Sequence, residues 1–351
     1  METVLLSGDS AGVRCAISEL RAGQVVALPT ETVYGLAANA LDPAAVSRIY
    51  QAKGRPADNP LIVHITGATQ ADSLAATIPA AAELLMESFW PGPLTIVLPK
   101  RVSVPDITTG GRADIGLRAP RNALFQQVLR ESELALAAPS ANVAGRPSPT
   151  TAEHVWHDLN GIIPLIIDGG PCEVGLESTV ISLVGDVPRL LRPGGVTLEQ
   201  VRATIGDVEV DDAVHQRAAP DFVPGAPGMK YQHYSPATPI TILSGTPPQI
   251  AAYLSDQRDS GGSGDSGTGF RIGMLCFDDD ADCFAPLPLV TYGRHDEGAA
   301  QARQLFDALH QVDALGVSHV YAQWPATETG VHLAVRNRLL KAAGHRVVRL
   351  P

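Results

Sequence analysis

Four short segments combine hydroxyl, amide and cationic side chains directly after apolar runs. The first, PTETVYGL at residues 29–36, follows VVAL and carries hydroxyl groups at Thr30 and Thr32. Hydroxyl groups at the exit of a strand suit hydrogen bonding of a small polar ligand. A turn capped by its own threonines would explain the same residues, and this segment alone does not separate the two interpretations.

The second segment, KGRPADNPLIVH at residues 53–64, places two cations close together. Lys53 and Arg55 flank Gly54 where a helix is expected to end, and Pro56 stiffens the exit. Because two neighbouring cations repel each other, an anion between them is a natural counterpart. The alternative is that both stabilise the carboxyl end of the helix, where cations are favourable.

The third segment, APSAN at residues 138–142, puts Ser140 and Asn142 at alternate positions. In an extended backbone their side chains point the same way. They could hold phosphate oxygens or the water shell of a metal ion. An Asx or serine turn would account for the same pair.

The fourth segment joins EST at residues 177–179 with RLLRPGG at residues 189–195, where Arg192 precedes a turn that lets a ligand approach the backbone. If the basic residues near such turns converge, they form a positive pocket, and a nucleoside triphosphate is its obvious ligand. These residues are Lys53, Arg55, Arg118, Arg121, Arg146 and Arg192.

The composition excludes several classes of protein. The chain has 351 residues, with 26 Lys and Arg against 37 Asp and Glu, so a nucleic-acid module of high bulk positive charge is not expected. No apolar run approaches the ~20 residues of a membrane-spanning helix, and the amino terminus lacks the pattern of a signal peptide. Four widely spaced cysteines fit neither a disulfide scaffold nor a zinc site. We expect a reduced, soluble, cytoplasmic protein that does not associate with membranes.

The elements that must position these side chains form an α/β fold. Short apolar runs alternate with helical patterns through residues 1–204, which predicts a mixed sheet with helices. Asp42 and Pro43 predict the start of a helix that Gly54 ends. Thr197 and Gln200 predict a capping box for another helix.

Two further regions follow this first domain. Residues 205–237 have little apolar periodicity and are far longer than a usual connection, which indicates a linker with a function of its own. From residue 238 to residue 351, strands alternate with helices, which predicts parallel βαβ units in a smaller Rossmann-like domain.

The segments together resemble a known family. PTETVYGLAANA, KGRPADNPL, FWPGPLTIVL, GLRAP, APSAN, ESTVI and RPG occur in this order and resemble the YrdC-like threonylcarbamoyl-AMP synthases over about residues 10–200. PGMKYQHYSP and TGVHLAVRNRLLKAAG resemble the long form of the enzyme, which has a C-terminal Rossmann-like domain. The resemblance implies a YrdC-like twisted mixed sheet followed by that smaller α/β domain.

The resemblance also implies an activity. The family is a group of nucleotidyltransferases that make L-threonylcarbamoyladenylate and pyrophosphate from L-threonine, bicarbonate or CO2, and ATP. A downstream complex transfers the threonylcarbamoyl group to adenosine 37 of tRNA, so weak or no direct tRNA binding is expected of this chain. Mg²⁺ is expected with ATP, with no protein metal ligands and no tightly bound cofactor.

The resemblance assigns residues to three roles. The catalytic set is Lys53, Arg55, Ser140 and Asn142. The L-threonine-binding set is Thr32, His64, Arg118, Ala138 and Ser178. The ATP-binding set is Lys53, Arg55, Asn59, Ser140, Asn142, Ser148, Arg192 and Tyr234, the last reaching back from the linker.

The implied chemistry requires no covalent nucleophile, only positioning and charge stabilisation. A threonine amine attacks CO2, and an oxygen of the resulting carbamate displaces pyrophosphate from ATP. Since a carbamate loses CO2 readily in water, the linker at residues 205–237 is the candidate lid, with His233 and Tyr234 at its tip.

Two other functions compete with this one. An RNA-binding module of YrdC fold that makes no adenylate is the first, although aromatic residues for base stacking are only 5% of the chain. Carbamoyltransferases of hydrogenase maturation also contain YrdC-like domains, but their acylphosphatase and zinc-finger segments are missing here.

Overall fold

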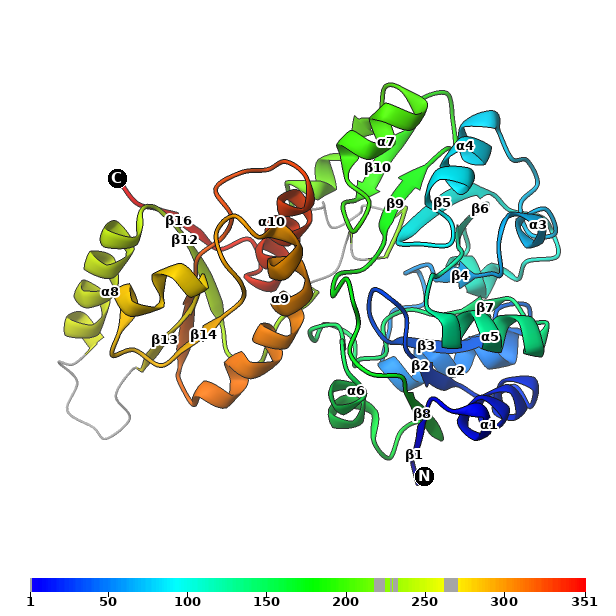
Figure 1. Ribbon diagram of the computed structural model, residues 1–351, viewed down its shortest axis with the longest axis horizontal. Helices are drawn as coiled ribbons and strands as arrows, with labels where there is room; N and C mark the ends of the chain where they lie inside the picture. Colours follow the sequence, from blue (N-terminus) through cyan, green and yellow to red (C-terminus); the bar gives the residue numbers. More distant parts are fainter. Residues whose placement is uncertain (1, 218–224, 228, 230–232, 262–270) are drawn as a thin grey trace. The chain divides into compact units, whose positions relative to one another are not determined.

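The computed structural model describes residues 2–217, 225–227, 229, 233–261 and 271–351 (Figure 1). They divide into two compact units. Unit 1 comprises residues 2–144 and the described residues between 148 and 229. Unit 2 comprises residues 145–147 and the described residues from 233 onward. Among the described residues, no helix is both long enough and apolar enough to span a membrane.

Unit 1 is built on a mixed sheet that has eleven strands among the described residues. In spatial order the strands are β1 (Val4–Ser7), β8 (Leu165–Asp168), β2 (Val26–Leu28), β3 (Gly35–Asn39), β7 (Leu136–Ala137), β4 (Ile62–His64), β6 (Asp114–Arg118), β5 (Leu94–Pro99), β9 (Thr179–Ser182), β10 (Arg189–Arg192) and β11 (Glu209–Val210). Parallel and antiparallel pairs both occur, for example β4 with β6 and β5 with β6, which confirms the predicted mixed sheet.

The helices of unit 1 connect these strands. They are α1 (Ser10–Arg21), α2 (Pro43–Lys53), α3 (Ala68–Ala71), α4 (Ala80–Phe89), α5 (Ala123–Ser132), α6 (Ala152–Leu159) and α7 (Leu198–Ile205), with short 3₁₀ helices at Asp106–Thr109 and Asp212–Val214. The sequence signals at the ends of two of them are confirmed. The Asp42 carboxylate accepts from the amide of Ala44 at 2.8 Å, Gly54 ends α2 at φ +60°, and Thr197 with Gln200 forms a capping box on α7.

Two apolar clusters pack on different strands of the sheet. Helices α1 and α5 pack against β2, β3, β7 and β8 through fully buried side chains such as Leu20 and Phe125. On strands β4, β5, β9 and β10 a second cluster faces the linker. Its members are Ile62, Val97, Val180, Leu191, Ala213, Ala226 and Met229. Ala213, Ala226 and Met229 of the linker therefore pack on the sheet of unit 1.

Unit 2 contains a parallel sheet of five strands among its described residues, as predicted. In spatial order they are β14 (Leu289–Thr291), β13 (Ile272–Cys276), β15 (His319–Ala322), β12 (Ile240–Ser244) and β16 (Val347–Arg349). Its helices are α8 (Pro247–Gly261), α9 (Gly298–Val312) and α10 (Val331–Ala342), with 3₁₀ helices at Asp278–Phe284 and Asp313–Leu315.

Candidate active site

Polar side chains gather where five neighbouring strands of unit 1 begin or end at one edge of the sheet. His64 ends β4 and pairs in register with Arg118, which ends β6. Strand β5 runs antiparallel to β6, so Thr95 lies near its beginning at the same edge. Ser178 immediately precedes β9, and Arg192 ends the antiparallel β10. The topology thus brings together residues more than 100 positions apart.

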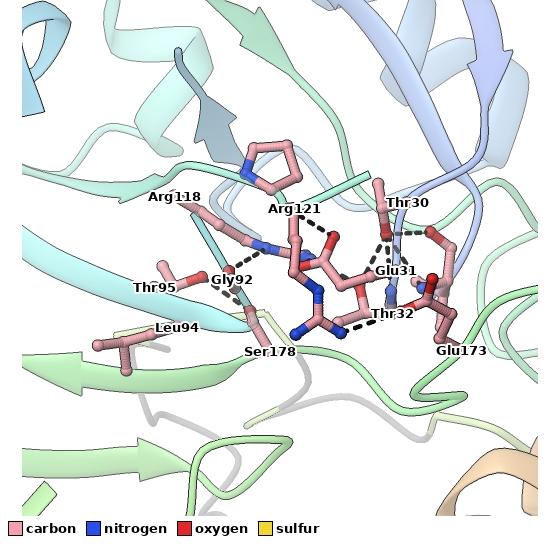
Figure 2. A network of polar contacts seen from close by, with 12 residues as sticks. Thr30, Glu31, Thr32, Gly92, Leu94, Thr95, Arg118, Arg121, Glu173 and Ser178 are labelled. Carbon is pink, nitrogen blue, oxygen red and sulfur yellow. Dashed lines mark hydrogen bonds and ion pairs between the residues drawn. The ribbon is translucent and has the colours of Figure 1, made fainter. Parts of the chain in front are cut away.

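Arg118 is buried and held on three sides (Figure 2). Its Nη2 donates to Glu31 at 2.7 Å, its Nη1 donates to the hydroxyl of Thr32 at 2.9 Å, and its Nε donates to the carbonyl of Gly92 at 3.3 Å. Among the described residues these bonds occupy three of the five guanidinium N–H groups. The remaining two can bind the carboxylate of a ligand, for which guanidinium geometry is well suited.

Glu31 is the counter-ion of Arg118, and the sequence analysis did not identify it. Its side chain is only 2% exposed. One carboxylate oxygen pairs with Arg118 and the other accepts from the backbone amide of Arg121 at 3.0 Å. The buried thiol of Cys172 lies in the field of both charged groups. The acidic residue inside the first polar segment was the only sequence signal for this role.

Thr30 and Thr32 form a buried turn next to Arg118. The Thr30 hydroxyl donates to the carbonyl of Val33 at 2.6 Å and accepts from the amides of Thr32 and Val33 at 3.1 and 3.2 Å. The hydroxyl oxygens of Thr30 and Thr32 are 2.8 Å apart. The self-capped turn, one of the two alternatives that the sequence posed, is therefore present, and ligand binding by this segment stays a prediction.

Ser178 connects the strand edge to the linker. Its hydroxyl oxygen is 2.7 Å from that of Thr95 and accepts from Nη2 of Arg192 at 3.1 Å. Arg192 also donates through Nη1 to the carbonyl of Pro227 at 3.3 Å. Ser178 and Thr95 share a sheet face with Val180 and Val97, on which Ala226 and Met229 pack. The linker thus covers the sheet right beside this hydroxyl pair.

His64 is buried beside Arg118 and packs on Phe125, with ring centroids 5.2 Å apart. Burial, reinforced by the Arg118 charge, lowers the pKa of His64 well below its ordinary 6.5. The imidazole is therefore neutral at pH 7. Its Nδ1 is buried and has no hydrogen-bond partner among the described residues, which leaves a polar atom available to a ligand.

Lys53 ties the third polar segment to the end of α2. Its ammonium nitrogen donates to the carbonyls of Ser140 and Asn142, the latter at 2.6 Å. Burial, and then the neighbouring Arg55, lower the pKa of Lys53 well below its ordinary 10.5. Lys53 thus fixes the backbone that carries Ser140 and Asn142.

Arg55, Asn59 and Ser148 lie around this segment. Arg55 donates to the carbonyls of Asn59 and Pro60 at 3.1 and 2.9 Å. The side-chain oxygen of Asn59 is buried and has no partner among the described residues. The Ser148 hydroxyl donates to Glu177 at 2.6 Å, directly before Ser178. Through Glu177, Ser148 of the predicted nucleotide set is therefore connected to the neighbour of Ser178 from the predicted threonine set.

Ala138 leaves the end of β7 beside the same turn. A side chain at Gly35 would approach the Cβ of Ala138 to 3.2 Å, so these two segments touch. Gly35 also forms an isolated bridge with Ser140. The predicted residue Ala138 therefore lies against the strand that follows Thr32, as a member of the first apolar cluster.

Three residues from the sequence analysis belong to unit 2, namely Arg146, His233 and Tyr234. Tyr234 packs on Phe306, with ring centroids 5.2 Å apart, and Arg338 stacks over its ring. Arg146 pairs with Asp313 at 3.6 Å. The other predicted site residues all lie in unit 1. Residues 218–224, 228 and 230–232 of the predicted linker lie outside the described residues.

Comparisons with known proteins agree with this fold. A family model of the Sua5, YciO and YrdC proteins, described as telomere recombination, matches residues 18–194. A model described as the C-terminal domain of threonylcarbamoyl-AMP synthase matches residues 196–344. The chain therefore combines the two domains that define this class.

Individual relatives match over nearly the whole chain. The threonylcarbamoyl-AMP synthase of Bacillus subtilis is 44% identical, over 98% of this chain and 96% of its own length. The synthase of Pyrococcus abyssi is 43% identical, over 96% of each chain. The crystal structure of P. abyssi Sua5 complexed with L-threonine covers 99% of this chain and 100% of its own at a TM-score of 0.89 and 40% identity. The chain belongs to the threonylcarbamoyl-AMP synthase family.

Proposed function

We propose that this chain makes L-threonylcarbamoyladenylate and pyrophosphate from L-threonine, bicarbonate or CO2, and ATP. The main support is its similarity along the full length to synthases, one of which has been crystallised with L-threonine. The buried guanidinium of Arg118, which has N–H groups left for a carboxylate, supports the amino-acid half of the proposal. The product would serve a downstream complex that modifies adenosine 37 of tRNA.

The proposed reaction has two steps. The threonine amine attacks CO2, which forms the new N–C bond of a carbamate as the nitrogen loses a proton. A carbamate oxygen then attacks the α-phosphorus of ATP, and the bond to the pyrophosphate leaving group breaks. No enzyme atom becomes covalently bound, so the residues act by holding both substrates and by balancing charge.

The site residues divide naturally between the two substrates. Arg118 would bind the threonine carboxylate, with Thr32, His64 and Ser178 around the rest of the amino acid. Lys53 would hold the Ser140–Asn142 segment against the nucleotide, while Arg55 and Arg192 would balance phosphate charge. The Asn59 side-chain oxygen, buried without a partner among the described residues, is suited to accept from an N–H group of the nucleotide.

We propose that Mg²⁺ enters the site bound to ATP. Among the residues that the structure describes, no group of three His, Cys, Asp or Glu side chains gathers to hold an ion. Phosphate oxygens and water would therefore supply its ligands, and none of the roles above depends on a protein-bound metal.

The test is a reaction with the full chain, ATP, Mg²⁺, L-threonine and labelled bicarbonate. Pyrophosphate release and label in a threonine adduct of AMP are expected, and both should disappear when threonine is omitted. Pyrophosphate that forms equally without threonine would overturn the proposal. So would salt-dependent tRNA binding without any consumption of ATP, which is the behaviour of the RNA-binding alternative.

A further inference from the structure

The hydroxyl groups of the site can be assigned as donors or acceptors because each carries only one proton. Four hydroxyls are involved, on Thr30, Thr32, Thr95 and Ser178, and all four residues are at most 2% exposed. We propose that Thr30 and Thr95 are positioning residues that make Thr32 a hydrogen-bond acceptor and Ser178 a hydrogen-bond donor toward the amino-acid substrate. This inference rests on the proposed function. It adds which hydroxyl of the threonine site donates a hydrogen bond to the substrate and which one accepts.

The Thr30 proton is committed to the backbone. A carbonyl cannot donate, so the 2.6 Å contact between the Thr30 hydroxyl and the Val33 carbonyl requires the proton of Thr30. The 2.8 Å contact between the two hydroxyls is then carried by the proton of Thr32, which shares the Thr30 oxygen with the amides of Thr32 and Val33 at 3.1 and 3.2 Å. Arg118 donates to the same Thr32 oxygen at 2.9 Å. Thr32 therefore has one lone pair left and no proton, so it can only accept from a ligand.

The second pair of hydroxyls, on Thr95 and Ser178, presents a donor to the ligand instead of an acceptor. Thr95 is fully buried, and Ser178 is the hydrogen-bond partner of its hydroxyl among the described residues, at 2.7 Å. A buried hydroxyl proton without an acceptor is costly, so Thr95 donates to Ser178. Because Arg192 also donates to this oxygen, both lone pairs of Ser178 are occupied. The Ser178 proton is then directed to a ligand, toward which Ser178 acts as a donor.

The two polarities fit the two ends of an amino acid. An acceptor at Thr32 is suited to the substrate nitrogen, which carries N–H groups. A donor at Ser178 is suited to a substrate oxygen and excludes the amine as its partner. Thr30 and Thr95 need not touch the substrate to set this arrangement, since each acts through one neighbouring hydroxyl.

The experiment compares Thr95→Val, which removes the hydroxyl at nearly constant volume, with Thr95→Ser, which keeps it. Threonine affinity is measured by calorimetry, and steady-state kinetics follow pyrophosphate release. Thr95→Val should raise the threonine Kd and KM about fivefold and change kcat and the ATP KM less than twofold, because one oriented hydrogen bond is lost. Thr95→Ser should restore the threonine affinity to within about twofold.

A double-mutant cycle with Ser178→Ala separates orientation from structural damage. If Thr95 acts through Ser178, Thr95→Val should cause no further loss of threonine affinity in the Ser178→Ala background. A general structural defect would weaken binding in both backgrounds. Thr3→Val is the matched control, since the Thr3 hydroxyl is buried and donates to the Ile163 carbonyl next to the β1 edge. It should change thermal stability and leave the threonine Kd unchanged.

The role assigned to the Thr30 hydroxyl is tested by the same kind of comparison. Thr30→Ser keeps the proton and should bind threonine within about twofold of the wild type, whereas Thr30→Ala should bind more weakly. Equal losses of threonine affinity in Thr30→Ser and Thr30→Ala would overturn the assignment for Thr30. For Thr95, the assignment would be overturned by an unchanged threonine affinity in Thr95→Val or by additive effects in the double-mutant cycle. If the wild-type chain binds no threonine and releases no threonine-dependent pyrophosphate, the proposed function itself fails.

Discussion

At the scale of single residues, the site depends on a buried ion pair. The side chains of Arg118 and Glu31 are 5% and 2% exposed, and their contact is 2.7 Å. Such a pair contributes little net stability, but removing one partner leaves an uncompensated charge in the interior. The pair therefore fixes the guanidinium in place more than it stabilises the fold.

Arg118→Gln should lower the free energy of unfolding by about 3 kcal/mol, because Glu31 is left buried without its cation. The double variant Glu31→Gln, Arg118→Gln should recover part of this loss, while threonine binding stays abolished in both. Urea denaturation and calorimetry measure the two effects. A double variant that is less stable than Arg118→Gln would contradict the pairing argument.

Lys53 and Arg55 should both be needed for adenylate formation, but for different reasons. Lys53→Ala leaves two buried carbonyls without their donor, so activity should fall sharply and the unfolding free energy by about 1–3 kcal/mol. Arg55→Ala should lose activity with little loss of stability, because Arg55 is only half-buried. Arg101→Ala, at an exposed cation of the same unit, is the control and should behave as wild type. Full activity in both Lys53→Ala and Arg55→Ala would disprove the nucleotide assignment.

The residue types at the site could be predicted from the sequence, but their partners could not. Arg118, Ser178 and Arg192 stand out because each lies beside an apolar run. Glu31 and Thr95 are equally part of the network, yet a carboxylate 87 positions from its cation gives no local signal. Their pairing is decided by the order of strands in the sheet.

At the scale of elements, helix ends were more predictable than strands. The Asp42 and Gly54 ends of α2 and the capping box of α7 follow local rules and are confirmed. Strand β3, with the sequence GLAAN, has no alternating or β-branched pattern, and tertiary pairing with β2 and β7 makes it a strand. Strands β12, β13 and β15 of unit 2 carry apolar runs and were predictable.

The linker is the element with the most direct predicted effect on turnover. Ala226 and Met229 cover the sheet next to Ser178, and the Pro227 carbonyl accepts from Arg192. Replacing residues 227–236 with a Gly-Ser chain of equal length should sharply lower product yield, because the proposed lid loses the Met229 side chain that packs on the sheet. Pyrophosphate and adduct formation are measured together, with circular dichroism as the folding control. Unchanged turnover would rule out the lid.

At the scale of the whole molecule, stability should depend on pH through His64. The unfolded chain protonates this imidazole as the pH falls below about 6.5, whereas the folded chain keeps it neutral to a much lower pH. The unfolded state therefore binds more protons, and the free energy of unfolding should fall between about pH 7 and pH 5.

His64→Gln should flatten this part of the pH profile. Urea unfolding at a series of pH values provides the measurement. A profile that keeps its full slope in His64→Gln would show that other groups cause it.

The rate at which the buried Cys172 thiol is alkylated should report how often the protein opens locally. Burial, and then the Glu31 carboxylate, raise the pKa of this thiol to about 12, whereas Cys15 and Cys283 are exposed. Alkylating reagents should label those two cysteines at once and Cys172 only during excursions that loosen the pocket around Glu31 and Arg118. Saturating threonine should slow this late labelling further, so mass spectrometry of the unmutated protein can time how often the pocket opens.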